Sequence, residues 1–469
     1  MAATTVAGLV VDALGRAGVA RIFTAGTGVS PAFLLSAAER TLSLVRADGA
    51  ITAALMAAIT GELADAPGVV ILADAGAEDI RPAFRYAVAN RAPLVALTER
   101  GARTETASLL KGAVDVEPAS ASHWIAHAVQ LALSDPRGPV AVVIPPEVAI
   151  SPAIPMATAL RPVIPPPSAQ ALDAAAQLLV NAARPVLVVG LECRSGDVAG
   201  WLKPFAEKLP APALTTLKGK GVLPDPHPLA LGLVGSATAR SLLDRADLIV
   251  TVGVDVIEGA HDTWPPATTV LHLGRVSQAE AWPTTVDLVG DIALIIEELA
   301  PRIRTRSRAD WDVAELDRLK RSAIALARAD RSRLSRVLHV ARELTPAGTI
   351  AVVEPTTSEA TVAAAWPAVA PNELLIDLDV PEFPPAAAAA AALQHPDRQV
   401  ICVTTAPQAI LGVIEGLASS IVIVSVSPVP GPAVGRIATV TARDEPMLRA
   451  VLGRIARQRE PALVDASNI

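Results

Sequence analysis

Two histidines are the first residues whose type and spacing suggest chemistry. His123 and His127 stand four residues apart in a predicted helix, SASHWIAHAVQLAL. Side chains four apart share one helix face, and a histidine pair so placed can bind a metal. No glutamate stands between them in the metalloprotease pattern, and no third ligand is evident. A surface or packed histidine pair is therefore the simpler interpretation.

Three acids form a second candidate. Asp377, Asp379 and Glu382 lie within IDLDVPEFPP, residues 376–385, and a cation is one possible occupant. A solvated loop interrupted by prolines is the simpler interpretation. The two cysteines, Cys193 and Cys402, are far apart and belong to apolar runs, which predicts buried, inert thiols. No Ser-His-Asp or Cys-His arrangement can be read from the sequence.

The elements that would position these residues are short apolar runs alternating with helical stretches. Unbroken runs rich in Val, Ile and Leu predict strands that are covered on both faces of a parallel sheet. Strand–helix–strand order then predicts doubly wound α/β domains. The runs are ARIFTA, GVVILAD, APLVALT, GPVAVVIP, RPVLVVG, ADLIVTVG, TVLHLG, GTIAVVE, RQVICVTT and SSIVIVSVS.

Two joints divide the chain into three predicted domains. Six prolines in residues 151–168 exclude a helix or a central strand and indicate a linker. A charged helical stretch without strands, residues 306–329, indicates a connection. The predicted units are an N-terminal domain at 1–150, a linker at 151–167, a middle domain at 168–305, and a C-terminal domain at 330–469.

Composition limits the class of protein. With 51% hydrophobic and 19% charged residues, the chain is globular rather than disordered. A net charge of −7 without a basic stripe argues against nucleic-acid partners. The longest apolar tract, residues 384–393, is too short to cross a bilayer, and the N-terminus has no basic signal-peptide region. We expect a soluble, cytoplasmic protein.

Five segments make the chain resemble acetolactate-synthase-like members of the thiamine-diphosphate (ThDP) enzyme superfamily. They are RGPVAVVIPPEV at 137–148, TTLKGKGVLPDPHPL at 215–229, ADLIVTVG at 246–253, LVGD at 288–291 and PDRQVICVT at 396–404. The resemblance implies a pyrimidine-binding-like domain, a Rossmann-like middle domain and a shortened diphosphate-binding-like domain. It also implies ThDP and Mg²⁺ as the family's cofactors.

The resemblance places Asp48 where the family has the glutamate that hydrogen-bonds the aminopyrimidine of ThDP. The matching stretch is LVRADGAI, residues 44–51. Aspartate keeps the carboxylate but is one methylene shorter, and proton transfer requires atoms at hydrogen-bond distance. Asp48 is therefore a candidate catalytic residue. The alternative is that it caps the helix that follows.

The family's Mg²⁺-binding Gly-Asp-Gly triplet aligns with Thr405-Ala406-Pro407. Ala406 replaces the metal-binding carboxylate by a methyl group, and Pro407 removes a backbone N–H. The strand where the family has an asparagine ligand ends at Ser427, and no asparagine occurs between residues 372 and 468. Residues 350–435 hold one basic side chain, Arg398, against eight acids. An anionic diphosphate would be repelled there.

Three hypotheses follow from the resemblance. The chain is a non-catalytic or complex-forming subunit that has lost ThDP and Mg²⁺; or it is a decarboxylase or carboligase subunit active only with an intact, full-length partner chain; or it uses the inter-domain cleft for other chemistry. A long closing segment of the family is missing near residues 428–438, which would leave the cofactor site open to water.

Two further expectations concern ligands and assembly. Some relatives hold FAD or ADP in the middle domain, where Lys218 and Lys220 lie in this chain, but Gly253-Val254-Asp255 lacks the dinucleotide fingerprint, so a nucleotide is not expected. We expect a homodimer or tetramer, because the apolar helix at residues 50–60 would face a dimer interface in the family.

Overall fold

The computed structural model describes residues 4–25, 31–40, 42–72, 80–99, 104–265, 267–303, 309–377, 380–407, 420–427, 437, 439–458 and 460–469. Within these ranges the chain forms three six-stranded sheets whose strand pairs are all parallel. The expectation of three doubly wound α/β units is confirmed. All ten apolar runs singled out in the sequence are strands.

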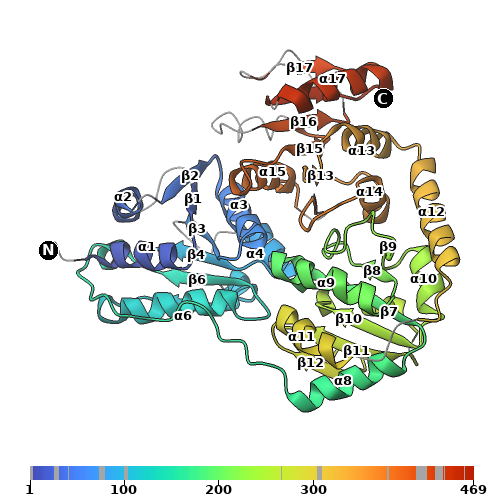
Figure 1. Ribbon diagram of the computed structural model, residues 1–469. Coiled ribbons are helices and arrows are strands. Elements are labelled where there is room, and N and C mark those ends of the chain that lie inside the picture. Colours follow the sequence, from blue (N-terminus) through green and yellow to red (C-terminus); the bar gives the residue numbers. More distant parts are fainter. Residues whose placement is uncertain are drawn as a thin grey trace.

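The first sheet has the order β2-β1-β3-β4-β6-β5 and lies at the N-terminal end of the molecule (Figure 1). A Thr5 hydroxyl caps its first helix by accepting from the N–H of Gly8. Its strands are β1 Arg21–Ala25, β2 Ser43–Ala47, β3 Gly68–Leu72, β4 Leu94–Thr98, β5 Gly112–Asp115 and β6 Pro139–Val143. Its helices are α1 Val6–Arg16, α2 Pro31–Glu39, α3 Ala50–Leu63, α4 Arg81–Ala89, α5 Thr104–Ala107, η2 Pro118–Ser120, α6 Ala121–Leu133 and α7 Pro146–Ala149.

The second sheet has the order β12-β11-β10-β7-β8-β9, the arrangement of a Rossmann-type domain. The order reverses between β7 and β10, and ligands of such folds bind beyond the carboxyl ends of strands at that point. The strands are β7 Pro185–Val189, β8 Ala213–Thr215, β9 Ala230–Leu233, β10 Leu248–Val252, β11 Thr269–Gly274 and β12 Val286–Val289. The helices are α8 Ala169–Asn181, η3 Leu191–Arg194, α9 Gly196–Lys208, α10 Ala237–Leu243, η4 Val256–Glu258, η5 Ala260–Thr263, α11 Ile292–Leu299 and η6 Ala300–Arg302.

The third sheet has the order β14-β13-β15-β16-β18-β17, which repeats the topology of the first sheet strand for strand. The charged helix α12 runs along the outside of the molecule between the second and third sheets (Figure 1). The strands are β13 Ile350–Val353, β14 Leu374–Ile376, β15 Val400–Thr404, β16 Ile421–Ser425, β17 Thr439–Thr441 and β18 Ala462–Asp465. The helices are α12 Val313–Ala329, α13 Arg333–Leu344, α14 Glu359–Ala365, α15 Phe383–Gln394 and α17 Glu445–Gln458.

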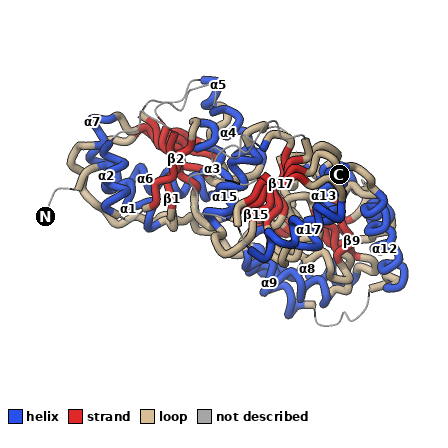
Figure 2. The backbone as a smooth tube through the Cα atoms, turned by 90° about the horizontal axis from the view of Figure 1, so that it is seen from above, coloured by secondary structure: helices blue, strands red, loops and turns tan. Residues whose placement is uncertain are grey.

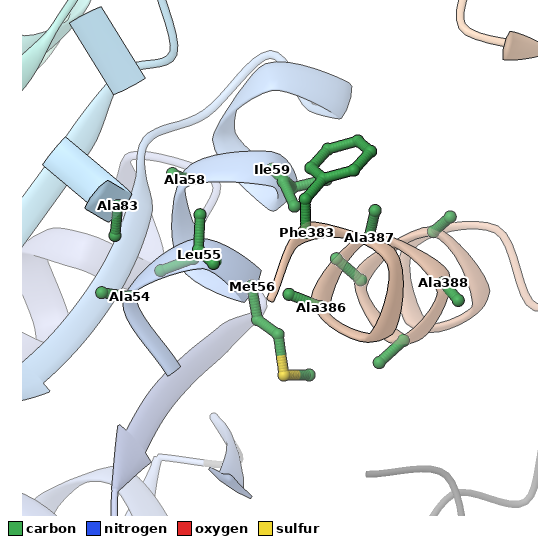
Figure 3. Close-up of a cluster of buried hydrophobic side chains, with 14 of the residues drawn as sticks. Ala54, Leu55, Met56, Ala58, Ile59, Ala83, Phe383, Ala386, Ala387 and Ala388 are labelled. Atoms are coloured by element: carbon green, nitrogen blue, oxygen red, sulfur yellow. The ribbon is translucent and has the colours of Figure 1, made fainter. Parts of the chain in front are cut away.

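Equivalent helices of the first and third units pack against each other. Helix α3 follows the second strand of its sheet and α15 follows the second strand of its own. The two helices lie side by side where the N-terminal unit meets the rest of the molecule (Figure 2), and their side chains share one hydrophobic cluster (Figure 3). Both are rich in alanine, which favours helix and lets helices approach closely.

This packing covers the helix that the sequence suggested for a dimer interface. Residues 53–59 of α3 are buried by α15, α4 and β3 of the same chain. A homodimer or tetramer stays a prediction. The described part of the chain contains no helix long and apolar enough to cross a bilayer.

Candidate functional site

The candidate catalytic carboxylate, Asp48, lies in the turn between β2 and α3. Its side chain is exposed, and no hydrogen bond from it to the helix forms. Gly49, with extended backbone angles, occupies the N-cap position of α3, so the interpretation of Asp48 as the cap is wrong. Asp48 stands at the carboxyl edge of the N-terminal sheet, facing solvent.

The corresponding edge of the C-terminal sheet is closed by Glu354, which directly follows β13. Its carboxylate accepts hydrogen bonds from the Thr404 hydroxyl, the Thr405 hydroxyl and the Thr405 N–H, each at 2.7 Å. Burial raises the pKa of Glu354, but these hydrogen bonds outweigh it, and the net pKa lies below the ordinary value. The ionised carboxylate thus binds β15 to β13 internally.

The residues aligned with the Mg²⁺ motif offer little to a metal. The N–H of Ala406 donates to the Thr404 hydroxyl at 3.0 Å, its methyl group is exposed, and Pro407 is buried. Beyond β16, the backbone oxygen of Ser427 accepts a hydrogen bond from the Ser425 hydroxyl at 2.6 Å. The local backbone is therefore held by hydroxyl groups of the chain itself.

Basic groups are sparse among the described residues at this edge. Arg398 donates to the carbonyl of Gly348 and lies 3.6 Å from Glu373, at the amino ends of the strands and away from the motif. Arg333, at the start of α13, does reach the carboxyl edge and donates to the Val426 carbonyl at 2.8 Å. The sequence reasoning missed Arg333 because it considered only residues 350–435.

The acidic candidates do not assemble into a metal site. Asp377 caps the following backbone by accepting from Val380 N–H at 3.1 Å. Glu382 begins α15 without a side-chain cap bond, and Asp379 lies outside the described residues, as does the loop at 73–79. Among the described residues, no group of three His, Cys, Asp or Glu side chains is placed to hold a metal. The described residues at this edge supply no set of oxygen ligands that fits a Mg²⁺–diphosphate group.

No third metal ligand joins the two histidines among the described residues. His123 and His127 are exposed on α6, with stacked rings 6.4 Å apart and Trp124 at their edges.

The switch point of the middle sheet is filled by acids of the chain. Glu258 accepts from the N–H groups of Leu191 and Asp255, both at 3.0 Å, and from the Thr216 hydroxyl. These are the backbone donors that a nucleotide phosphate would use at this position. Burial raises the pKa of Glu258 to about 7. The two lysines are engaged elsewhere: Lys218 lies 3.7 Å from Glu62, and Lys220 pairs with Asp225 at 2.5 Å.

A charged pocket of about 320 Å³ lies beside this point, between the N-terminal and middle units. We call it the interdomain pocket. Asn372, from the C-terminal unit, also lines it. Its charged lining residues are Glu62, Asp65, Arg91, Asp135, Arg137, Glu192, Arg194, Asp197, Asp255 and Arg275. Burial raises the pKa of Glu192 to about 8, and its carboxyl accepts from the Arg275 N–H at 2.6 Å.

Sequence reasoning missed this pocket entirely. A usable signal existed, because Glu192 and Asp255 closely follow β7 and β10, the two strands at which the order reverses. Nothing in the sequence indicated that Arg137 belongs to this pocket, because Arg137 precedes β6, a strand of the first sheet.

Comparisons with known proteins agree with this architecture. Residues 172–299 match the family described as the thiamine pyrophosphate enzyme central domain. The acetolactate synthase large subunit of Corynebacterium glutamicum is 29% identical over 217 residues, which are 42% of this chain and 34% of that protein. The isozyme 1 large subunit of Escherichia coli acetolactate synthase is 28% identical over 299 residues, 59% of this chain and 51% of that protein.

A solved structure from Mycobacterium smegmatis, considered a thiamin diphosphate-dependent enzyme, has the same fold. It superposes with a TM-score of 0.79 at 21% identity, covering 98% of each chain. The sequence matches to the synthases take in only a third to a half of each relative's length. The chain therefore shares its fold with a ThDP-dependent enzyme, and its sequence is similar to the central domain of thiamine pyrophosphate enzymes and to acetolactate synthase large subunits.

Proposed function

We propose that this chain is a non-catalytic or complex-forming member of its superfamily that binds neither ThDP nor Mg²⁺. The observation that carries the proposal is the closed edge at β13 and β15, where Glu354 takes three hydrogen bonds from Thr404 and Thr405. Ala406 supplies no oxygen ligand there. Mg²⁺ requires several oxygen ligands in octahedral geometry, and the described residues supply no such set.

The middle domain supports a parallel conclusion for FAD and ADP. Glu258 already accepts the hydrogen bonds of the backbone donors near β7 and β10. A phosphate brought to the same donors would have to displace a buried carboxyl group and would meet like charge. We therefore include nucleotides among the ligands that this chain does not hold.

Isothermal titration calorimetry with ThDP and Mg²⁺ tests the proposal. We expect no binding heat from the purified chain, while an intact acetolactate synthase titrated in the same buffer gives a signal. Micromolar binding of ThDP that depends on Mg²⁺ would overturn the proposal.

A second function rests on the exposure of Asp48 at the carboxyl edge of β2. A carboxylate in that position is free to contribute to a site completed by a full-length partner chain. Co-purification with such a partner, and loss of the mixture's decarboxylase or carboligase activity in Asp48→Ala, would favour this alternative. Unchanged activity of the mixture after Asp48→Ala would exclude it.

A further inference from the structure

The interdomain pocket contains two kinds of arginine. Arg91 is fully engaged, since it binds Asp255 through two hydrogen bonds of 2.7 and 2.9 Å. Arg194 is engaged as well, because it pairs with Glu62 and donates to the Asn90 carbonyl at 2.9 Å. These two arginines join the middle domain to the N-terminal domain, and their charges are balanced.

The other two arginines, Arg137 and Arg275, are not balanced in this way. The Nε atom of each is buried and has no hydrogen-bond partner. Arg137 lies 3.8 Å from Asp135 and 3.9 Å from Asp65, distances beyond a hydrogen bond. No ion pair of the Arg275 guanidinium within 4.0 Å is found in the part of the chain that the structure describes.

The two guanidinium groups repel each other electrostatically, and both residues line the pocket. Burial lowers the pKa of Arg137, and the charge of Arg275 is the next cause. Arg137 comes from the turn before β6 and Arg275 from the turn after β11, so two separate domains bring like charges together. Both residues line the pocket and are partly exposed, so an anion bound there would offset the repulsion between the two like charges.

The volume and the neighbouring acids limit the size of that anion. A cavity of about 320 Å³ is at the small end of the range for ligand pockets. Glu258 and Glu192 occupy the backbone donors on the middle-domain side, which excludes an extended nucleotide.

We propose that Arg137 and Arg275 bind a small oxyanion, either a phosphate group or the carboxylates of a small acid, in the interdomain pocket. Guanidinium groups recognise both chemistries through paired N–H donors. Because all three domains line the pocket, the bound anion stabilises their arrangement by mass action.

Calorimetry with inorganic phosphate and with malonate, in chloride buffer of matched ionic strength, tests the site and separates the two sources of oxyanion. We expect at least one probe to bind, with an affinity at least about tenfold lower in Arg137→Gln and in Arg275→Gln. Arg16→Gln, which changes an exposed arginine on α1, should bind as the parent does. No heat from either probe, or equal affinity in both pocket variants, would overturn the proposal.

A third variant covers the case in which the arginine variants fail to fold. Asp135→Asn removes the carboxylate nearest Arg137 and should tighten binding of the probe. Unchanged or weaker binding in this variant contradicts the proposal.

The same variants separate this inference from the proposed function. Failure of phosphate and malonate to bind would overturn the pocket proposal and leave the proposed function standing. Binding of ThDP that persists in Arg275→Gln would overturn the proposed function alone.

Discussion

At the scale of single residues, three hydrogen-bonded carboxyl groups in this chain have opposite protonation behaviour. Hydrogen bonds at the end of β13 lower the pKa of Glu354 and keep it ionised. Burial instead raises the pKa of Glu192 and of Glu258, so both stay protonated to higher pH. The difference follows from the number of donors aimed at each group relative to its burial. Glu354 lies at the edge of the C-terminal sheet where the relatives' cofactor motif aligns. Glu192 and Glu258 lie at the switch point of the middle sheet, where a nucleotide would bind in a Rossmann-type fold.

Replacing Glu354 by glutamine should weaken the C-terminal sheet. The glutamine NH₂ group is itself a donor and would face the donors of Thr404 and Thr405. At least one of the three hydrogen bonds is therefore lost. We expect Glu354→Gln to lower the free energy of unfolding by about 2 kcal/mol, measured by urea denaturation. Glu117→Gln, at an exposed position, is the control and should be neutral. Equal stability of the two variants would contradict the role assigned to Glu354.

The pH dependence of stability should reveal Glu192. The folded protein keeps this proton to about pH 8, whereas an unfolded glutamate releases it near pH 4.5. The folded state therefore binds more protons between these values, and this group's stabilisation is lost as the pH rises through the window. Glu192→Gln should reduce the fall in unfolding free energy between pH 5.5 and 8.5, in a series of urea titrations.

Glu258 contributes a fall of the same sign, with a folded pKa of about 7, so Glu192→Gln should lessen the slope without removing it. The slope in Glu117→Gln should match the parent. If Glu192→Gln shows the same fall in unfolding free energy as the parent and Glu117→Gln, the raised pKa assigned to Glu192 is wrong.

At the scale of elements, apolar runs identified ten of the twelve interior strands of the described sheets, all but β8 and β18, and none of the edge strands. The ten apolar runs became β1, β3, β4, β6, β7, β10, β11, β13, β15 and β16. These strands have neighbours on both sides, so they are apolar throughout. Edge strands such as β5 and β17 are short and partly exposed, and their sequences, GAVD and TVT, carry no continuous apolar pattern. Their pairing comes from tertiary context.

The α3–α15 contact gives the clearest prediction for an element. Ala387 is fully buried in the shared cluster (Figure 3), so a leucine there must displace its neighbours. We expect Ala387→Leu to destabilise the protein by about 1–3 kcal/mol. Ala325→Leu, on the exposed face of α12, adds the same side chain to a helix and should be neutral within about 0.5 kcal/mol. Thermal unfolding followed by circular dichroism measures both, and a neutral Ala387→Leu would show that the two helices pack loosely.

At the scale of the whole molecule, the sequence reached the architecture but not the site between domains. Local apolar runs are sufficient to predict the strands of parallel sheets. The resemblance to a known family is sufficient to identify single substituted positions such as Ala406. The convergence of Arg137 and Arg275 depends on how two domains sit against each other. No local pattern encodes that arrangement, since the two residues are separated by a domain boundary and serve different strands.

The distribution of hydrophobic clusters also predicts how the molecule opens. One cluster runs without interruption from α3 into α15 and joins the first and third sheets. The middle sheet has separate clusters, and charged pairs such as Arg91–Asp255 and Arg194–Glu62 join it to the N-terminal domain. Buried ion pairs add little net stability compared with apolar packing. The first and third units should therefore open together, and the middle unit independently.

The two fully buried thiols report on these units, since Cys193 belongs to the middle domain and Cys402 lies on β15. We expect single-thiol variants, Cys193→Ser and Cys402→Ser, to be unreactive toward a thiol reagent until urea opens the relevant unit. Ala387→Leu should then lower the urea concentration at which Cys402 reacts and leave that of Cys193 unchanged. An equal shift at both thiols would mean that the charged contacts couple the middle domain as tightly as the alanine-rich helices couple the other two.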